Sequence, residues 1–266
     1  MLKVAVTGCA GRMGQEISRL VLDHPGMELA GGTVHAQHPL LGSPLLSLLG
    51  KGNAGPKIAA SLKDIIGAID VVIDFTAPSA SLEHFNIVAD AGKAIVVGTT
   101  GFSPEQKKQM ESRANAVKCV TAPNMSVGVN VMFNLLAQAA KTLKGYDIEI
   151  MEIHHNLKKD APSGTAMRLA EICARETGRD LAKTGVYGRE GIVGERKPDE
   201  IAVMSLRMGD VVGEHTVYFG GNGERVEITH KATSRKNFAA GAVRAAEWLP
   251  HQKNGFYDMQ DVLGLK

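Results

Sequence analysis

The chain has 266 residues, a formal net charge of +2, 44% hydrophobic residues and 5% aromatic residues. This length suits one or two domains with a substantial core, and neither the charge nor the few aromatic side chains favours nucleic acid as a partner. The apolar stretches are interrupted short of a membrane span, the first residues resemble a strand rather than a signal peptide, and three scattered cysteines form no disulfide framework. We therefore expect a cytoplasmic protein without membrane or nucleic-acid partners.

A strand, a glycine-rich turn and a helix are predicted at the start of the chain. The apolar run 2–7 leads into a turn with three glycines, and an amphipathic stretch that includes Ile17 and Val21 follows. Glycines let the backbone approach a pyrophosphate closely, and the first N–H groups of a helix attract phosphates. We therefore expect a dinucleotide at the turn formed by Gly8, Cys9, Ala10, Gly11, Arg12, Met13 and Gly14.

Three features of this turn leave its chemistry open. Its spacing is G-x-x-G-x-x-G rather than the common G-x-G-x-x-G, so taken alone it also suits a plain tight turn. Arg12 suits a phosphate contact and a solvated first-turn position equally well. We expect all three cysteines to be packing residues, and Cys9 is the one whose thiol pKa a helix N-terminus would lower.

The end of the second predicted strand bears on the choice of cofactor. In many NAD sites an Asp or Glu follows this strand and binds the ribose hydroxyls. Here the strand pattern 27–34 is followed by His35. Because no carboxylate stands there to repel a 2′-phosphate, the sequence allows NADPH as well as NADH.

Further strands alternate with helices through the first half of the chain. Strand patterns over 70–76, 94–97 and 117–125 end in polar or glycine-rich segments, and the first two are followed by helical patterns. This alternation predicts a parallel sheet with right-handed crossovers, in which the loops at the carboxyl ends of the strands line one crevice.

A histidine pair and a lysine mark the middle of the chain. His154 and His155 end an alternating strand pattern, and Lys158 follows His154 by four residues. Ser163 is a predicted N-cap, and the helix behind it would offer N–H groups to an anion, with Gly164 leaving room for its approach. The loop therefore predicts an acidic small molecule as substrate, with His154 as a proton carrier.

A metal site is the other interpretation of paired histidines. No second cluster of His, Cys or Asp has recognisable ligand spacing, so we expect no metal. The remainder of this half contains strand patterns over 201–206, 215–219 and 225–229, an exposed loop over 188–199, and a final helix over 237–249.

The ordered motifs resemble those of the dihydrodipicolinate reductase (4-hydroxy-tetrahydrodipicolinate reductase) family over nearly the whole chain. The family signature lies in residues 152–166, and the other matching segments are residues 8–14, 74–76, 97–102, 124–130, 212–216 and 227–232. The resemblance implies an α/β fold: a Rossmann-like dinucleotide-binding domain over 1–125 and 237–266, and an α+β domain with an open mixed sheet over 126–236. It assigns substrate binding and assembly into a homotetramer to the second domain.

The resemblance also implies the reaction and the site. NADPH or NADH would reduce a cyclic imine dicarboxylate in lysine and diaminopimelate biosynthesis, and the 4-hydroxyl would leave as water. His154 and Lys158 would be catalytic, and the substrate would contact His155, Ser163, Gly164 and Thr165. The residues implied for the cofactor, besides 8–14 and His35, are Gly98, Thr99, Thr100, Ala122, Pro123, Asn124 and Met125.

Two other functions remain open on the sequence. A protein with the same two halves would serve as a non-catalytic NAD(P) sensor, although the intact His154 and Lys158 argue against this. A dehydrogenase of another small acid is the second alternative, because a dinucleotide fold alone fixes no substrate. The sequence leaves the extent of domain closure and the preferred cofactor undetermined.

Overall fold

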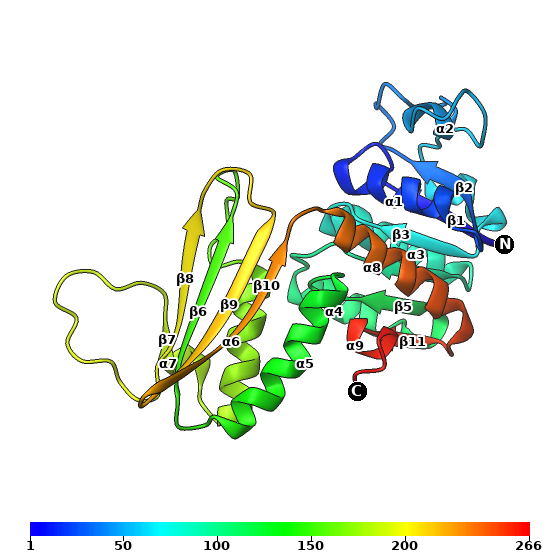
Figure 1. Cartoon of the computed structure of the whole chain (residues 1–266). Coiled ribbons are helices and arrows are strands. Elements are labelled where there is room, and N and C mark those ends of the chain that lie inside the picture. The colour runs from blue at the N-terminus through cyan, green and yellow to red at the C-terminus, as the bar shows by residue number, and fades with distance from the viewer. The chain divides into compact units, whose positions relative to one another are not determined.

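The computed structural model describes all residues from Met1 to Lys266 and contains two compact units (Figure 1). Unit 1 consists of Met1–Val127 and Arg235–Lys266, and unit 2 consists of Gly128–Ser234. The chain therefore leaves the first unit, forms the second and returns. Each unit is described by itself.

Unit 1 is built on a six-stranded parallel sheet with the strand order β11-β5-β4-β3-β1-β2. β3 and β4 are buried along their whole length, as expected for parallel strands covered on both faces. The strands are β1 Leu2–Thr7, β2 Met27–Thr33, β3 Val71–Asp74, β4 Ala94–Val97, β5 Lys118–Thr121 and β11 Gly255–Tyr257.

Helices cover both faces of this sheet, because alternate strand residues belong to two separate hydrophobic clusters. Val4 and Ile73 pack with residues of α1 and α8, whereas Val72 and Ile95 pack with residues of α3 and α4. The helices of unit 1 are α1 Arg12–Asp23, α2 Leu45–Leu48, α3 Pro78–Asp90, α4 Pro104–Glu111, α8 Lys236–Trp248 and α9 Met259–Val262, with short 3-10 turns at Leu62–Asp64, Ile66–Ala68, Ala114–Ala116 and Leu249–His251.

Unit 2 is a five-stranded mixed sheet with the order β10-β9-β6-β8-β7. β8 runs parallel to β6 and β7, whereas β9 runs antiparallel to β6 and β10. The strands are β6 Asp147–His154, β7 Gly185–Val186, β8 Ile201–Arg207, β9 Gly213–Gly221 and β10 Glu224–Ala232, and the helices are α5 Val127–Thr142, α6 Gly164–Thr177 and α7 Leu181–Thr184.

α5 and α6 pack on one face of the second sheet (Figure 1). Ile148 and Ile150 of β6 point into this packing, together with Val217 and Phe219 of β9. The opposite face carries Glu149, and the long segment between β7 and β8 is fixed there through Arg189 and Arg196, both of which bind Glu149. None of the helices combines the length and the apolar character that a membrane crossing requires.

The fold class predicted from the sequence is confirmed. Parallel and mixed sheets stand where the strand patterns predicted them, and the loop over 188–199 is largely exposed. Within the segment 117–125, predicted as a strand with a polar exit, β5 covers Lys118–Thr121. The polar exit beyond it contains Pro123, which has no backbone N–H to donate to a sheet.

Candidate active site

The carboxyl ends of five parallel strands of unit 1 lie level with one another. In register, Thr7 pairs with Thr33 and Asp74, Asp74 pairs with Val97, and Val97 pairs with Thr121. The loops after β1, β2, β3, β4 and β5 therefore leave the sheet at one edge, which is where ligands bind in open α/β sheets. The structure thus gathers the predicted cofactor residues at this edge.

The glycine turn after β1 has the geometry of a phosphate cradle. Gly8 has a φ of 61°, and Gly11 is the N-cap of the twelve-residue helix α1 without a side-chain capping bond. A Cβ on Gly14 would lie 2.2 Å from the Gly8 carbonyl oxygen, so only glycine lets the helix approach the turn this closely. N–H groups that no side chain caps, next to a turn with glycines at 8, 11 and 14, fit the pyrophosphate of a dinucleotide.

The other residues of the turn differ in exposure. Arg12 and His35 are exposed, and the His35 ring lies 5.2 Å from the His38 ring. Ala10 and Met13 are partly buried against the core. Cys9 is buried, and burial raises the pKa of its thiol to about 11. All three cysteines are buried, as expected for packing residues. The alternative of a lowered thiol pKa at Cys9 is not supported, because desolvation outweighs the hydrogen bonds from the backbone.

A buried carboxylate joins several of these strand ends. Asp74 accepts hydrogen bonds from the hydroxyls of Thr7 at 2.7 Å, Thr99 at 2.8 Å and Thr76 at 3.0 Å, and it lies 2.6 Å from Nδ1 of His84. Burial alone would raise the pKa of Asp74, but the bond and charge of His84 and the threonine hydroxyls lower it below its ordinary value. We call this group the Asp74 clamp.

The Asp74 clamp fixes the loop after β4. The Thr99 hydroxyl donates a hydrogen bond to Asp74 and accepts one from the Thr76 N–H at 2.9 Å. The Thr99 side chain therefore links the loop after β4 to the loop after β3. A Cβ on Gly98 would lie 2.1 Å from the Phe75 ring, which shows how closely that ring covers the Gly98 backbone. Thr100 is exposed beside them.

Part of the loop after β5 is buried. Ala122 and Met125 belong to the buried core, and α8 passes so close that a Cβ on Gly241 would lie 1.8 Å from the Met125 carbonyl oxygen. Pro123 is exposed, and Asn124 accepts a hydrogen bond from the Ser126 N–H at 2.8 Å. The backbone of this loop is therefore held by packing and by a side-chain bond.

In unit 2 the helix-covered face of the sheet changes from apolar to polar at one end. Along β6, Ile148 and Ile150 are followed at the same two-residue spacing by Glu152 and then His154. Along β9, which runs the other way, His215 lies directly opposite Glu152. The hydrophobic core therefore ends in a polar layer beside the loop that leads to α6.

Glu152 is the centre of this layer. Its carboxylate is fully buried and receives both terminal nitrogens of Arg207, at 2.9 and 3.0 Å, the Nδ1 of His154 at 2.5 Å, and the Ser163 N–H at 3.1 Å. Burial would raise its pKa, but the bonds from His154 and Arg207 outweigh this and lower it to about 2. Glu152 is therefore ionised and accepts every bond that it makes.

His154 and His215 stand edge to face, with ring centroids 5.2 Å apart. His215 bonds to the Ser163 hydroxyl at 3.0 Å, and that hydroxyl also caps α6 by accepting from the Ala166 N–H. Burial first, and then the charge of His154, lower the pKa of His215 to about 3, so it is neutral at physiological pH. The predicted N-cap at Ser163 is confirmed, and its side chain is linked to the polar layer.

The loop between β6 and α6 holds the predicted lysine. Lys158 binds both carboxylate oxygens of Asp160 at 2.8 Å, and these bonds lower the pKa of Asp160. The Lys158 N–H bonds to the His155 carbonyl at 3.2 Å, so the lysine follows the histidine pair in one turn. Gly164 is exposed and a Cβ there would meet nothing within 4 Å, whereas Thr165 is buried and His155 is partly buried.

Four residues of this region were not predicted to have a role: Glu152, Arg207, His215 and Asp160. A signal for Glu152 and His215 exists in the sequence, because each is a polar residue that continues an alternating apolar series on its strand. Arg207 carries no such signal: it reaches Glu152 only through the pairing of β6 with β8, 55 residues apart along the chain.

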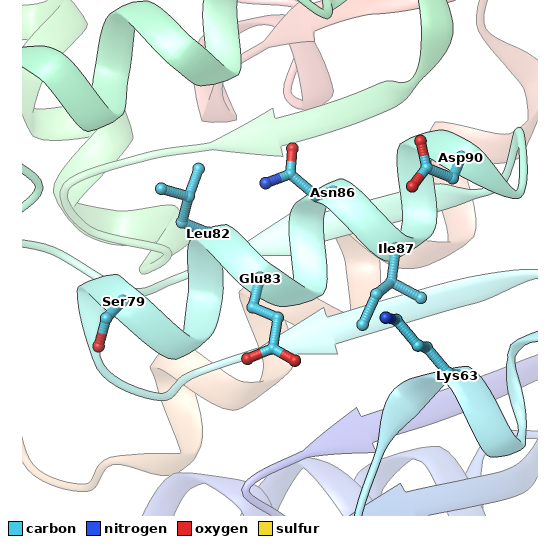
Figure 2. A pocket seen from close by; sticks show the side chains of 7 residues that line it. All are labelled: Lys63, Ser79, Leu82, Glu83, Asn86, Ile87 and Asp90. Atoms are coloured by element: carbon cyan, nitrogen blue, oxygen red, sulfur yellow. The ribbon is translucent and has the colours of Figure 1, made fainter.

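A separate hollow of about 330 Å³ lies along α3 in unit 1 (Figure 2). Glu83 and Asp90 line it from the helix and Lys63 lines it from the neighbouring turn, and none of the predicted site residues takes part. Its lining contains charges of both signs and residues distant in sequence from the glycine turn. We therefore do not assign the active site to this hollow.

The fold and the two groups of residues define a class of protein. A parallel sheet with a phosphate cradle, followed by a mixed sheet whose polar layer holds an imidazole beside a lysine loop, is typical of a two-domain dinucleotide-dependent oxidoreductase.

Comparisons with known proteins identify the family. The family model described as dihydrodipicolinate reductase, N-terminus, matches residues 2–125, and the model described as dihydrodipicolinate reductase, C-terminus, matches residues 128–263. The chain is 53% identical to the 4-hydroxy-tetrahydrodipicolinate reductase of Anaeromyxobacter dehalogenans, over 100% of this chain and 99% of that one. It is 51% identical to that of Syntrophotalea carbinolica, with both chains covered in full. The chain belongs to the dihydrodipicolinate reductase family.

Solved structures agree with this assignment. A dipicolinate-bound dihydrodipicolinate reductase from a Paenisporosarcina species has a TM-score of 0.77 and 28% identity, with 98% of each chain covered. An amine dehydrogenase from Mycobacterium smegmatis has a TM-score of 0.61 at 14% identity over 96% of this chain and 94% of that one, and this likeness concerns the fold alone.

Proposed function

We propose that this chain reduces 4-hydroxy-tetrahydrodipicolinate to tetrahydrodipicolinate in lysine and diaminopimelate biosynthesis. In the net reaction one hydride and one proton add to the cyclic substrate and its 4-hydroxyl leaves as water. The nicotinamide cofactor supplies the hydride when it is bound. The observation that carries the proposal is the contact network of the family signature: Glu152 bonds both to His154 and to Ser163 at the start of α6, and Lys158 stands in the loop between them.

The proposed proton chemistry belongs to His154 and Lys158. His154 directs Nδ1 to Glu152, and its Nε2 makes no hydrogen bond within the protein. That nitrogen is therefore the atom that would give or take a proton. Lys158 would exchange its bond with Asp160 for one to the substrate, where its ammonium stabilises negative charge or donates a proton.

The start of α6 would bind a carboxylate of the substrate. Gly164 leaves open space next to the first turn, and the helix is fourteen residues long, so its positive end is well developed. Thr165 and His155 are the neighbouring contacts in this proposal. Ser163 would act mainly as the N-cap, because its N–H and hydroxyl are already bonded to Glu152 and His215.

For unit 1 we propose a dinucleotide site at the carboxyl edge of the sheet that accepts NADPH and NADH. The uncapped N-terminus of α1 suits the pyrophosphate, and exposed His35 leaves the ribose position without a carboxylate that repels a 2′-phosphate. Comparing kcat/KM for the two cofactors in the wild type and in His35→Glu tests this point. The variant should disfavour NADPH, and an unchanged ratio would count against the role of His35.

We further propose a cytoplasmic homotetramer that assembles through unit 2. Three free, buried cysteines suit a reducing compartment. Met151, Met204 and Tyr218 are only half-buried, and by strand alternation they stand on the sheet face opposite to α5 and α6. Light scattering behind a sizing column should report four chains for the wild type and fewer for Met204→Glu.

The test of the proposed reaction is the loss of reduced-cofactor absorbance with enzymatically generated 4-hydroxy-tetrahydrodipicolinate. His154→Gln and Lys158→Ala should each lose about a hundred- to ten-thousand-fold in kcat, the usual contribution of a general acid. Lys159→Ala is the matched control, because Lys159 is the exposed neighbour of Lys158. If Lys159→Ala turns over substrate at the wild-type rate while Lys158→Ala does not, the catalytic lysine is Lys158.

The same assay separates the alternatives. A wild type that binds NADPH but reduces no imine dicarboxylate would point to a sensor. Turnover only with another small acid would point to a different dehydrogenase on the same fold.

A further inference from the structure

We infer that Glu152 is a positioning residue that holds the His154 imidazole in one tautomer and one orientation for proton transfer. The inference rests on the proposed role of His154, and it adds two residues, Glu152 and its partner Arg207, to the machinery of the reaction.

The hydrogen bonds determine the tautomer. An ionised carboxylate only accepts, so the 2.5 Å contact between Glu152 and His154 requires a proton on Nδ1 of the imidazole. Nε2 is then a lone-pair acceptor in the neutral ring and a donor in the cation. Either state leaves Nε2 as the nitrogen that exchanges protons, as the chemistry of a proton carrier requires.

The carboxylate itself is held on three sides. Arg207 makes a bidentate contact with both carboxylate oxygens, and the Ser163 N–H donates to the oxygen that does not face His154. Arg207 also donates to the Asp160 carbonyl at 2.7 Å, which ties the lysine loop to the same guanidinium. Because Glu152 is fully buried and bonded from several directions, it has little freedom to rotate away from the imidazole.

The surroundings of His154 favour the same orientation. His215 packs edge to face against its ring and is itself neutral, so it adds no repelling charge. A Cβ on Gly213 would lie 3.0 Å from His154 Nε2, so glycine at this position keeps the space next to the exchanging nitrogen open. Glu152 therefore fixes the Nδ1 side of the ring, and the lack of a side chain at Gly213 leaves room beside Nε2.

The decisive variant is Glu152→Gln, which keeps the shape and replaces the charge. The amide can place its NH2 group against Nδ1, and the imidazole then carries its proton on Nε2. We expect kcat to fall by at least about tenfold, within the range that general acid catalysis contributes, while KM for NADPH stays at the wild-type value. Glu149→Gln is the matched control, because Glu149 is also an arginine-bound carboxylate on β6 but contacts no histidine.

A direct reading of the tautomer does not depend on turnover. In protein labelled with ¹⁵N-histidine, two-bond and three-bond correlations distinguish a ring protonated on Nδ1 from one protonated on Nε2. The His154 signal is identified by its loss in His154→Gln. We expect the Nδ1-protonated pattern in the neutral wild-type ring and in Glu149→Gln, and a shift to the Nε2-protonated pattern in Glu152→Gln.

The outcomes separate this inference from the proposed reaction. An Nε2-protonated ring in the wild type, or an unchanged pattern together with unchanged kcat in Glu152→Gln, would overturn the inference even if the enzyme is active. A wild type without turnover but with the expected ring patterns would reject the reaction and keep the inference. If Glu152→Gln does not fold, as judged by circular dichroism, Glu152→Asp takes its place. The shorter side chain keeps the charge but withdraws the carboxylate from Nδ1 of His154, so the two tautomers should mix and kcat should fall. Wild-type values of both would overturn the inference.

Discussion

The Asp74 clamp makes a prediction about both stability and cofactor binding. Asp74→Asn keeps the size of the side chain but removes the charge opposite His84 and presents a donor to groups that already donate. An Asn NH2 group in place of one carboxylate oxygen leaves two buried donors without an acceptor, and each costs about 1–3 kcal/mol in the free energy of unfolding. For a unit of this size a total of about 2–6 kcal/mol corresponds to a fall in Tm of roughly 4–24 °C. We expect KM for NADPH to rise as well, because the clamp holds the loop that contains Thr99.

The assay is thermal unfolding followed by circular dichroism, with Asp90→Asn as the control. Asp90 binds Arg113 at the surface and its side chain is 71% exposed, so its loss should change the free energy of unfolding by about 0–1 kcal/mol. Because the pKa of Asp74 lies below its ordinary 3.8, the clamp stabilises the native state above that pH and is lost as the pH falls through the lower native value. A variant as stable as Asp90→Asn at neutral pH would refute the clamp.

Three further perturbations follow from the two sites. Gly213→Ala should lower kcat without unfolding the protein, because the added methyl group would lie 3.0 Å from His154 Nε2. Turnover equal to the wild type would show that the surrounding side chains move enough to accommodate the methyl group. Gly14→Ala should abolish NADPH binding, measured by quenching of cofactor fluorescence, because its Cβ has no room beside the glycine turn. Acid should destabilise the protein in two stages. The unfolded chain protonates His215 near 6.5 whereas the native pKa is about 3, so stability falls from pH 6.5 downward; the stabilisation from Glu152 is then lost between 4.5 and about 2. His215→Asn should flatten the first stage in a titration of Tm.

The fold was predictable because its signals are local. Alternation in β6, the buried runs of β3 and β4, and the glycine turn before α1 each lie within about ten residues, so the sequence reveals them directly. The end of β5 is local as well, because Pro123 and Asn124 interrupt the apolar pattern soon after the ladder stops at Thr121.

The positioning groups of the site were harder to predict, because they depend on register. Arg207 meets Glu152 only when β8 is paired with β6 at a particular offset, and a shift of one residue would turn its side chain to the other face. Cys9 was correctly predicted as a packing residue, but only the structure shows that burial rather than the helix N-terminus determines the pKa of its thiol. Short-range sequence patterns therefore identify candidate site residues well, but they do not predict the burial or the hydrogen-bond partners of those residues.

Asp74 and Glu152 solve the same physical problem in the two units. Where a strand ends, its ladder of backbone hydrogen bonds ends too, and the loops beyond it have no regular partner. A buried carboxylate offers about four acceptor positions, so it can bind donors from several chain segments at once. Asp74 gathers Thr7, Thr99 and His84, and Glu152 gathers His154, Ser163 and Arg207. In each case the donors keep the carboxylate in its charged form, so removing the carboxylate leaves several buried donors without an acceptor. This coupling is why we expect single substitutions at these two carboxylates to disturb the loops that they hold more than substitutions at any one donor.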